Sequence, residues 1–391
     1  MTVAYKHYDP SLIEPVLPNR TRKLEDLAVE LALQAGDLTR GLHPIVVDSI
    51  GLFVRSMNCY YSNLIEGHRT TPRDIERALE KDFSDNPEQR DLQLEAIAHI
   101  EVQRSLDLNP HWQSMSVVSP DFIANIHREF YQRLPDVFWH LEGMDVVPGS
   151  LRTTNVVIGR HIPPTPDTLP SFLGRFEKAY NPDRLSNVDR IMAAAASHHR
   201  LLWIHPFLDG NGRVARLFSH AYLGRIGIGS SLWSVSRGLA RRVQRYRALL
   251  DRADQQRDND YDGRGNLTMA GLIAFCEFFL ETCLDQVGFM AQLLEPRQLL
   301  HRIEVYVASE VQLGRLKQGS FPLLREAFLK GSFRRGEAAA LTGYQERQAR
   351  YVLKRLLDTG LLVSDSPKAP VRLGFPLAAT EFWFPRLWVE I

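Results

Sequence analysis

Residues 205–216 of this 391-residue chain read His205-Pro206-Phe207-Leu208-Asp209-Gly210-Asn211-Gly212-Arg213-Val214-Ala215-Arg216. Glycines flank Asn211, and apolar residues at helical spacing follow directly (Val214, Leu217, Phe218 and Ala221). This pattern predicts a loop that leads into the N-terminus of a helix. Backbone N–H groups converge in such a loop, and the helix N-terminus carries a partial positive charge. The segment therefore indicates an anion-binding site.

The charged side chains of this segment favour a polyphosphate over a single phosphate. Arg213 and Arg216 are three positions apart, so they project from the same face of the first helical turn. Asp209 is a hard oxygen ligand of the kind that Mg²⁺ needs beside bound phosphates. His205 can act as a general base near neutral pH. The alternative is a simple turn between two helices with His205 packed at a helix end, but six polar or glycine positions agree with one chemistry.

These twelve residues also resemble the HxFx(D/E)GNGRxxR signature of the Fic family at every fixed position. The resemblance implies a helical Fic fold that transfers AMP from ATP to a Ser, Thr or Tyr hydroxyl of a target protein, with release of pyrophosphate. It implies that His205 deprotonates the hydroxyl, that Asp209 holds Mg²⁺, and that Phe207 anchors the loop in the interior. The remaining motif residues would hold the phosphates: the Asn211 side chain, the amides of Gly210 and Gly212, and Arg213 and Arg216 on the outer phosphates.

A second segment, residues 152–164, is similar to the flap of the Fic family. It is rich in β-branched residues and lies between prolines and glycines, which predicts a short strand or hairpin. The resemblance implies a β-hairpin that binds an extended target segment by main-chain pairing; a purely structural strand is the alternative. We also expect ATP contacts from flap residues and from two residues after the motif: Val156, Val157, Ile158, Gly159, Tyr246 and Arg247.

The segment Ser62-Asn63-Leu64-Ile65-Glu66-Gly67 fits the inhibitory pattern (S/T)xxxE(G/N) of the same family. Ser62 and Glu66 are four residues apart, so they share one face of a helix. The resemblance implies that Glu66 pairs with Arg216 and takes the place of the γ-phosphate of ATP, with Gly67 completing the pattern. This is the Fic class whose inhibitory helix lies in the same chain, N-terminal to the core. A solvated helix end is the alternative.

The C-terminal region differs in charge from the rest of the chain. Residues 330–391 contain ten basic and six acidic side chains, whereas the whole chain has a net charge of +1. We expect a helix over residues 345–358 with Arg347, Arg350 and Lys354 on its outer face, followed by a strand and a proline-containing wing. This order resembles a winged helix-turn-helix module. Weak DNA binding and a protein–protein role remain open for it.

We therefore predict a mainly α protein: a helical Fic-fold core with a short β-hairpin flap and a small C-terminal winged helix-turn-helix domain. The expected divisions are 1–110 for the arm and inhibitory helix, 111–295 for the catalytic core and 296–391 for the winged-helix-like domain. Two other functions stay open, namely removal of AMP from a modified target by the same site, and DNA-binding regulation with a minor nucleotide site. Self-modification and homodimer formation also stay open.

The composition favours a cytoplasmic protein with no membrane partner. Cys59, Cys276 and Cys283 form neither a disulfide framework nor a zinc-ligand spacing. The N-terminus has no apolar signal-peptide core, and we find no run of 18 apolar residues. The near-zero net charge gives no reason to expect the whole chain to bind nucleic acid.

Overall fold

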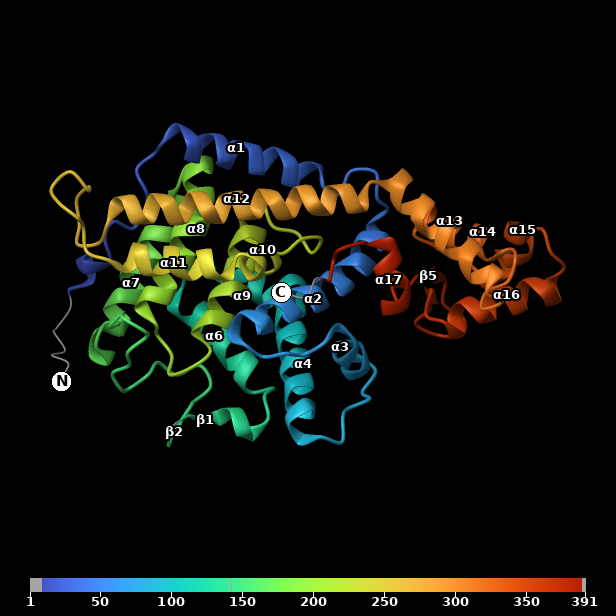
Figure 1. Ribbon diagram of the computed structural model, residues 1–391, viewed down its shortest axis with the longest axis horizontal. Helices are drawn as coiled ribbons and strands as arrows, with labels where there is room; N and C mark the ends of the chain where they lie inside the picture. Colours follow the sequence, from blue (N-terminus) through green and yellow to red (C-terminus); the bar gives the residue numbers. More distant parts are fainter. Residues whose placement is uncertain (1–8, 142, 389–391) are drawn as a thin grey trace. The chain divides into compact units, whose positions relative to one another are not determined.

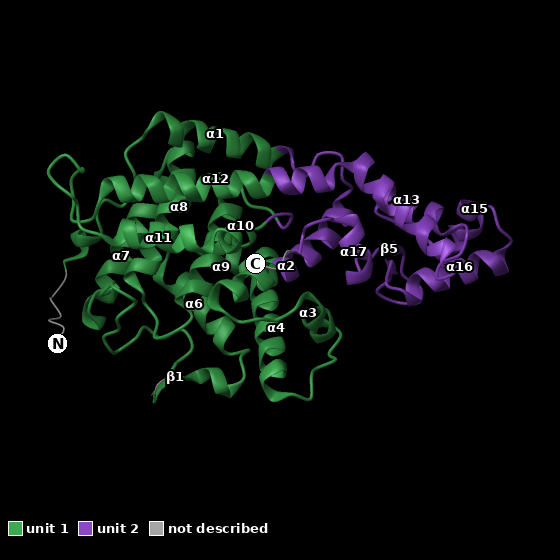
Figure 2. Ribbon diagram, in the orientation of Figure 1, with its two compact units in different colours: residues 1–36, 58–230, 234–287 green, residues 37–57, 231–233, 288–391 purple. Residues whose placement is uncertain are grey.

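The computed structural model describes residues 9–141 and 143–388, and nearly all of its regular structure is helical (Figure 1). Seventeen α-helices and five short strands occur in the described residues, which confirms the prediction of a mainly α fold. The chain forms two compact units (Figure 2). Unit 1 comprises residues 1–36, 58–230 and 234–287, and unit 2 comprises residues 37–57, 231–233 and 288–391.

These units differ from the predicted divisions 1–110, 111–295 and 296–391, because neither unit is continuous in sequence. Within unit 1, α4 (Pro87–Leu108) packs against α6 (Pro120–Tyr131) and α9 (Asn211–Arg225), so the N-terminal helices belong to the core that carries the 205–216 segment. Within unit 2, the ring of Phe53 packs against Phe384 with ring centroids 5.5 Å apart. Contacts between distant segments therefore define units that do not correspond to continuous stretches of sequence.

Unit 1 is a helical body with one short hairpin. Its α-helices are α1 (Arg22–Asp37), the second part of α2 (Pro44–Glu66), α3 (Pro72–Leu79), α4, α5 (Pro110–Ser114), α6 (Pro120–Tyr131), α7 (Leu169–Tyr180), α8 (Asn187–Ile204), α9 (Asn211–Arg225), α10 (Val235–Arg241), α11 (Val243–Asp254) and most of α12 (Met269–Leu294). Its 3₁₀ turns are η1 (Pro10–Ile13), η2 (Asp136–Trp139), η3 (Pro166–Thr168) and η4 (Pro182–Arg184). Strands β1 (His140–Leu141) and β2 (Met144–Asp145) pair antiparallel.

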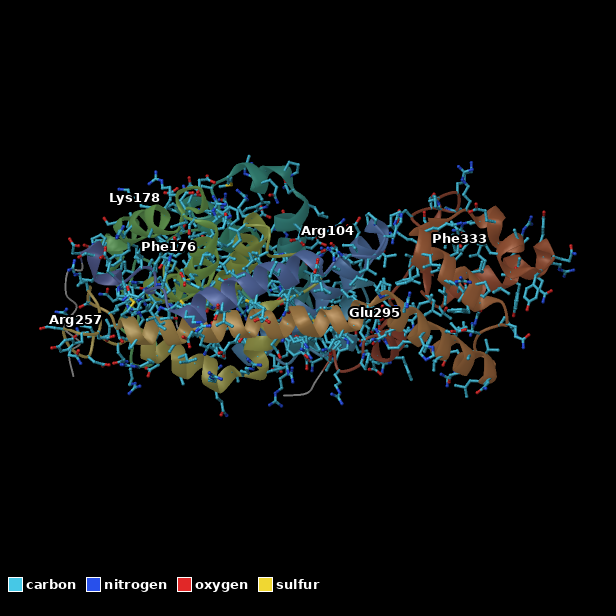
Figure 3. The ribbon with its side chains drawn as sticks, turned by 90° about the horizontal axis from the view of Figure 1, so that it is seen from above. Arg104, Phe176, Lys178, Arg257, Glu295 and Phe333 are labelled. Carbon is cyan, nitrogen blue, oxygen red and sulfur yellow. The ribbon has the colours of Figure 1, made fainter. Side chains whose placement is uncertain are left out.

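Local sequence signals explain where these helices begin. Thr71 caps α3: its hydroxyl accepts from the N–H of Asp74 (3.1 Å), and the Asp74 carboxylate accepts from the N–H of Thr71 (3.2 Å). Helix α8 is buried on nearly every face and packs against α7 and α9, as expected of a central helix. On α7, Phe176 is buried and Lys178 is exposed, which is the alternation of an outer helix (Figure 3).

Unit 2 combines helices with a three-stranded antiparallel sheet of order β3-β5-β4. Its remaining elements are α13 (Pro296–Gln312), α14 (Ser320–Lys330), β3 (Ser332–Phe333), η5 (Arg335–Glu337), α15 (Ala338–Thr342), α16 (Glu346–Asp358), β4 (Leu362–Val363), β5 (Val371–Leu373) and α17 (Leu377–Trp383). Helix, strand, two helices and two strands follow one another from α14 to β5. A winged helix-turn-helix requires this order, and membership of that class stays a prediction.

Across the described residues, no helix combines the length and the apolar character that a membrane span requires.

Buried histidines should make the stability of unit 1 depend on pH. Burial lowers the pKa of His99 and of His198 to about 3, and the pKa of His127 to about 4. Below pH 6.5 the unfolded chain binds protons that these native imidazoles do not. We therefore expect the unfolding free energy to be highest above pH 6.5 and to fall by about 1.4 kcal/mol per pH unit for each histidine between pH 6 and pH 4.

Urea unfolding at several pH values between 5 and 8 measures this slope. His99→Gln serves as the matched variant, because both ring nitrogens of His99 lack hydrogen-bond partners within the described residues. The variant should make the unfolding free energy fall less steeply with decreasing pH, by the contribution of about one bound proton. An unfolding free energy that stays constant from pH 7 to pH 5 would contradict the assignment.

Candidate active site

The 205–216 segment forms the predicted loop between α8 and α9. His205 ends α8 in the left-handed conformation (φ 48°), and its N–H donates to the Leu201 carbonyl (3.1 Å). The side chain of Asn211 closes the loop on itself: the N–H of Phe207 donates to Asn211 Oδ1 (3.0 Å), and Asn211 Nδ2 donates to the Phe207 carbonyl (2.9 Å). In this structure the Asn211 amide therefore shapes the loop from within.

Arg152 fastens the loop to the flap segment. Its backbone N–H donates to the Pro206 carbonyl (2.9 Å) and its Nε donates to the His205 carbonyl (2.8 Å). The other guanidinium nitrogens donate to the carbonyls of Thr154 (2.9 Å) and Pro164 (2.5 Å). One buried side chain thus fixes both ends of the flap and the start of the loop. Sequence reasoning placed Arg152 in the flap but gave it no role, since nothing local marks an arginine as buried.

Helix α6 supports the loop from the other side. The rings of Phe207 and His127 stack with centroids 4.1 Å apart, and His127 stacks on Tyr131 at 4.4 Å. The Tyr131 hydroxyl then donates to Asp209 Oδ2 (2.6 Å). Phe207 is fully buried. Sequence reasoning missed His127 and Tyr131, because neither of these two residues belongs to a local motif. Tyr131 lies 78 positions from its partner Asp209.

Two glycines of the segment are required by close contacts. Gly210 adopts φ 76°, and a Cβ there would lie 2.7 Å from Cε2 of Tyr131. A Cβ at Gly212 would meet Oε1 of Glu66, so the Glu66 side chain would have to shift. The absence of side chains therefore allows Tyr131 and Glu66 to reach the N-terminus of α9.

The structure brings Ser62 and Glu66 of α2 together with Arg216 of α9. Arg216 Nε donates to Ser62 Oγ (2.9 Å), and Nη2 donates to the Ser62 carbonyl (3.2 Å) and to Glu66 Oε1 (2.5 Å). Burial opposes ionisation of Glu66, but the charges of Arg216 and Arg213 outweigh it and hold the pKa of Glu66 below its usual 4.5. Glu66 is therefore an anion at neutral pH.

The C-terminal end of α2 also receives Arg247. Gly67 follows α2 with φ 90°, and Arg247 Nη2 donates to the Ile65 carbonyl (2.8 Å). Tyr246 is only 3% exposed, and its hydroxyl lies 2.7 Å from Nε2 of the buried His198. The structure thus places Arg247 on the inhibitory segment and Tyr246 in the interior of unit 1. ATP contact by either residue stays a prediction.

Arg213 has a carboxylate partner that the sequence did not reveal. It forms an ion pair with Glu95 of α4, whose side chain has no exposed surface. Burial would lower the pKa of Arg213, but Glu95 and Glu66 raise it above the usual value, so the guanidinium stays charged. Glu95 lies in a helix with no motif around it, so only the folded structure identifies it.

The flap differs from the predicted hairpin. In residues 151–164 the only β pairing is a bridge between Ile158 and His161, each donating its N–H to the other's carbonyl (2.9 Å) across a turn with Gly159 at φ 60°. Val157 is 49% exposed and Ile158 43%. The β-branched residues have no partner strand here, and Arg152 holds the preceding backbone, so an extended segment forms without a ladder.

The surroundings of His205 keep its imidazole in the neutral form, the form that has a free nitrogen to accept a proton. Burial, and then the nearby charge of Arg152, lower the pKa of His205 to about 4, so the half-buried imidazole is neutral at pH 7. No group of three or more His, Cys, Asp or Glu side chains that could hold a metal ion occurs in the described residues. Asp209 alone therefore fits only a cation that takes most of its ligands from phosphates and water, as Mg²⁺ does.

Comparisons with known proteins find similarity to the Fic family. Residues 117–223 match the Fic/DOC family model. The chain is 42% identical over 79 residues to the protein adenylyltransferase Fic of Drosophila erecta, covering 20% of this chain and 16% of that protein. It is 29% identical over 220 residues to the Drosophila yakuba protein of the same name, covering 54% and 42%. The chain thus spans less than half the length of these curated relatives.

Solved structures are similar over more of the chain. A Fic family protein from Desulfovibrio desulfuricans G20 aligns with a TM-score of 0.53 at 16% identity, covering 92% of this chain and 98% of that one. Fic-1 from C. elegans aligns with a TM-score of 0.52 at 19% identity, covering 69% and 71%. The protein therefore has a mainly helical Fic fold. Within it, residues 117–223 are the part that matches the Fic/DOC family model.

The contact at Gly210 gives a stability prediction. Gly210→Ala should lower the unfolding free energy by about 2 kcal/mol or more, because alanine at positive φ is strained and its methyl group would meet the Tyr131 ring. Gly174→Ala on α7 is the control, since a Cβ there meets nothing within 4 Å, and it should stabilise by about 0.5–1 kcal/mol. Urea denaturation measures both, and equal effects would contradict the packing described.

Proposed function

We propose that this protein is a protein adenylyltransferase that transfers AMP from ATP to a Ser, Thr or Tyr hydroxyl of a target protein, and that Glu66 restrains it. The observation that carries the proposal is the contact between Glu66 and Arg216 at the N-terminus of α9, the helix that follows the loop of the neutral His205. The names of the curated relatives support a nucleotidyltransferase. The fold supports ATP binding at the loop, where helix N-terminal amides and two arginines converge.

The chemistry follows from the charges of the loop. Neutral His205 accepts the proton of the target hydroxyl as its oxygen attacks the α-phosphorus of ATP. The bond to the β-phosphate oxygen breaks, and pyrophosphate leaves with the negative charge. Amides at the N-terminus of α9 hold the phosphates in line for this attack. Asp209 would hold Mg²⁺, which neutralises phosphate charge when it is bound. The exposed Val157 and Ile158 give the flap an apolar edge against which a target segment can pair.

Restraint by Glu66 follows from competition for one guanidinium. Arg216 gives Nη2 to Glu66 and Nε to Ser62, so a γ-phosphate can reach this guanidinium only by displacing the carboxylate. ATP that binds without this contact would take a pose in which the α-phosphorus is turned from His205. Glu66 is also an anion that could activate water, so a second reaction stays open to the same residues: water attacks the phosphorus of a target-bound AMP, the bond to the target oxygen breaks, and AMP and the free hydroxyl are released.

Removal of the Glu66 carboxylate should activate the protein. Glu66→Gly should incorporate about tenfold or more label from α-labelled ATP than wild type, because it frees Arg216 for the γ-phosphate. Autoradiography of the protein itself and of added lysate measures this transfer. Glu66→Gly combined with His205→Ala should incorporate none, since it lacks the proton acceptor.

Glu101→Gly is the matched control, because Glu101 is an exposed carboxylate on α4. It should label as weakly as wild type. If Glu66→Gly labels no more than Glu101→Gly, but wild type releases AMP from a modified target, Glu66 acts in AMP removal and not as a brake.

A second function, weak DNA binding by unit 2, is supported by one face of α16. Arg347, Arg350 and Lys354 are all exposed on this face, together with Tyr351, while Val352 and Leu356 are buried. A helix with basic and aromatic side chains outward is suited to phosphate contacts. Because Phe53 packs against Phe375 and Phe384 within unit 2, residues 300–391 alone would lack part of their core. The full chain is therefore the proper test material.

Salt dependence tests this second function. The full chain should bind a labelled duplex by fluorescence anisotropy at low salt and lose most affinity between about 50 and 200 mM. Replacing Arg347, Arg350 and Lys354 together by Ala should weaken binding. It should also make the slope of log affinity against log salt concentration shallower, by up to the contribution of about three phosphate contacts. The control is a second triple variant of unit 2, in which Ala replaces Arg297, Arg325 and Arg334. It loses the same charge away from α16 and should bind like wild type. No binding at low salt would favour a protein-interaction role.

A further inference from the structure

The two arginines of the loop have different carboxylate partners, and the partners lie in different surroundings. Arg216 contacts Glu66, the last residue of α2, whose side chain is 33% exposed. Arg213 contacts Glu95, which lies within α4 and has no exposed surface. Helix α4 packs on both α6 and α9. A phosphate can therefore displace the Glu66 carboxylate toward solvent. The Glu95 carboxylate is enclosed and has no solvent-facing position to move to.

The contact with Glu95 also occupies only part of the Arg213 guanidinium. The ion pair uses Nη2, and the guanidinium carbon lies 5.6 Å from the centre of the Phe130 ring. Nε is buried and has no hydrogen-bond partner in residues 9–141 and 143–388, and Nη1 makes no hydrogen bond there either. A guanidinium held by one terminal nitrogen keeps its other terminal nitrogen for a second anion.

The far side of the Glu95 carboxylate is fixed as well. Its Oε2 lies 2.7 Å from Nδ1 of His68, a residue that follows directly after the inhibitory segment. Glu95 is therefore held between His68 and Arg213 and cannot rotate away from either without losing a charged or polar contact in the interior. Nη2 of Arg213 also lies 3.0 Å from Nδ1 of His68, so the three side chains form one cluster in which Glu95 supplies the negative charge that pairs with Arg213.

We propose that Glu95 is a positioning residue for ATP: it stays on Arg213 when nucleotide binds and aims the free edge of that guanidinium at the phosphates. The proposal rests on the adenylyltransferase function proposed above and deepens it. It divides the two carboxylates by role, with Glu66 as the one that phosphate replaces and Glu95 as the one that phosphate does not. Glu95 acts through Arg213 and does not contact the nucleotide.

Nucleotide binding by calorimetry tests the proposal in the Glu66→Gly background, where the competing carboxylate is gone. Adding Glu95→Gln should weaken ATP binding about tenfold or more, since a charge-assisted contact that orients Arg213 is lost. Adenosine, which has no phosphates, should bind equally well to both proteins. A merely structural defect would weaken adenosine as much as ATP, so that result would overturn the proposal.

Further variants separate the remaining outcomes. Glu101→Gln on the exposed face of α4 is the matched control and should leave both affinities unchanged. Glu95→Asp keeps the charge with a shorter reach, so it should weaken ATP binding by a smaller factor; it decides the question if Glu95→Gln does not fold. Tighter ATP binding by Glu95→Gln, or by Glu95→Asp, would make Glu95 a second competitor for phosphate and overturn the proposal.

Failure of the proposed function gives a different result from failure of this one. If Glu66→Gly binds no ATP, the adenylyltransferase proposal fails together with the role of Glu95. If Glu66→Gly binds ATP and transfers AMP, while Glu95→Gln and Glu95→Asp have unchanged ATP affinity, only the positioning role fails.

Discussion

Two guanidinium groups buried one turn apart on α9 impose the strongest constraint on this structure. Arg213 and Arg216 are almost completely removed from solvent, and an uncompensated buried charge costs several kcal/mol. Each therefore needs an anion delivered from elsewhere in the fold. Glu95 comes from α4 and Glu66 from α2, so both helices must pack at the N-terminus of α9. This requirement explains why N-terminal helices share unit 1 with the part that matches the Fic/DOC family model.

The same constraint connects stability to function. A phosphate chain carries the charge that the arginines need, so it can take over from a carboxylate at little electrostatic cost. Such an exchange needs a carboxylate that can leave. Glu66 is at the end of a helix and partly exposed, whereas Glu95 is enclosed. In the adenylyltransferase that we propose, one exchangeable and one fixed counter-ion would hold the site closed and keep the geometry that nucleotide binding requires.

Rigidity of the loop comes from groups outside it. Arg152 holds the carbonyls of His205 and Pro206, and the ring of His127 stacks on Phe207. Asn211 closes the loop with two hydrogen bonds of its own. Support of this kind fixes the position of reacting groups more tightly than a free loop could. Arg152 holds the base of the flap in place, and the flap has exposed apolar side chains near its tip. The flap is therefore fixed where it joins the loop and exposed to solvent near its tip.

The sequence alone was sufficient for features set by local spacing. Helical periodicity places Ser62 and Glu66 on one face, and glycines mark the loop before α9. These follow from residues within a few positions of one another. The tertiary structure decided the rest: the Glu95 partner of Arg213, the hydroxyl of Tyr131 on Asp209, the burial of Tyr246, the single-bridge flap and the discontinuous units. Each depends on packing between distant segments, such as the 78 positions that separate Tyr131 from Asp209, and no local pattern encodes which buried group meets which.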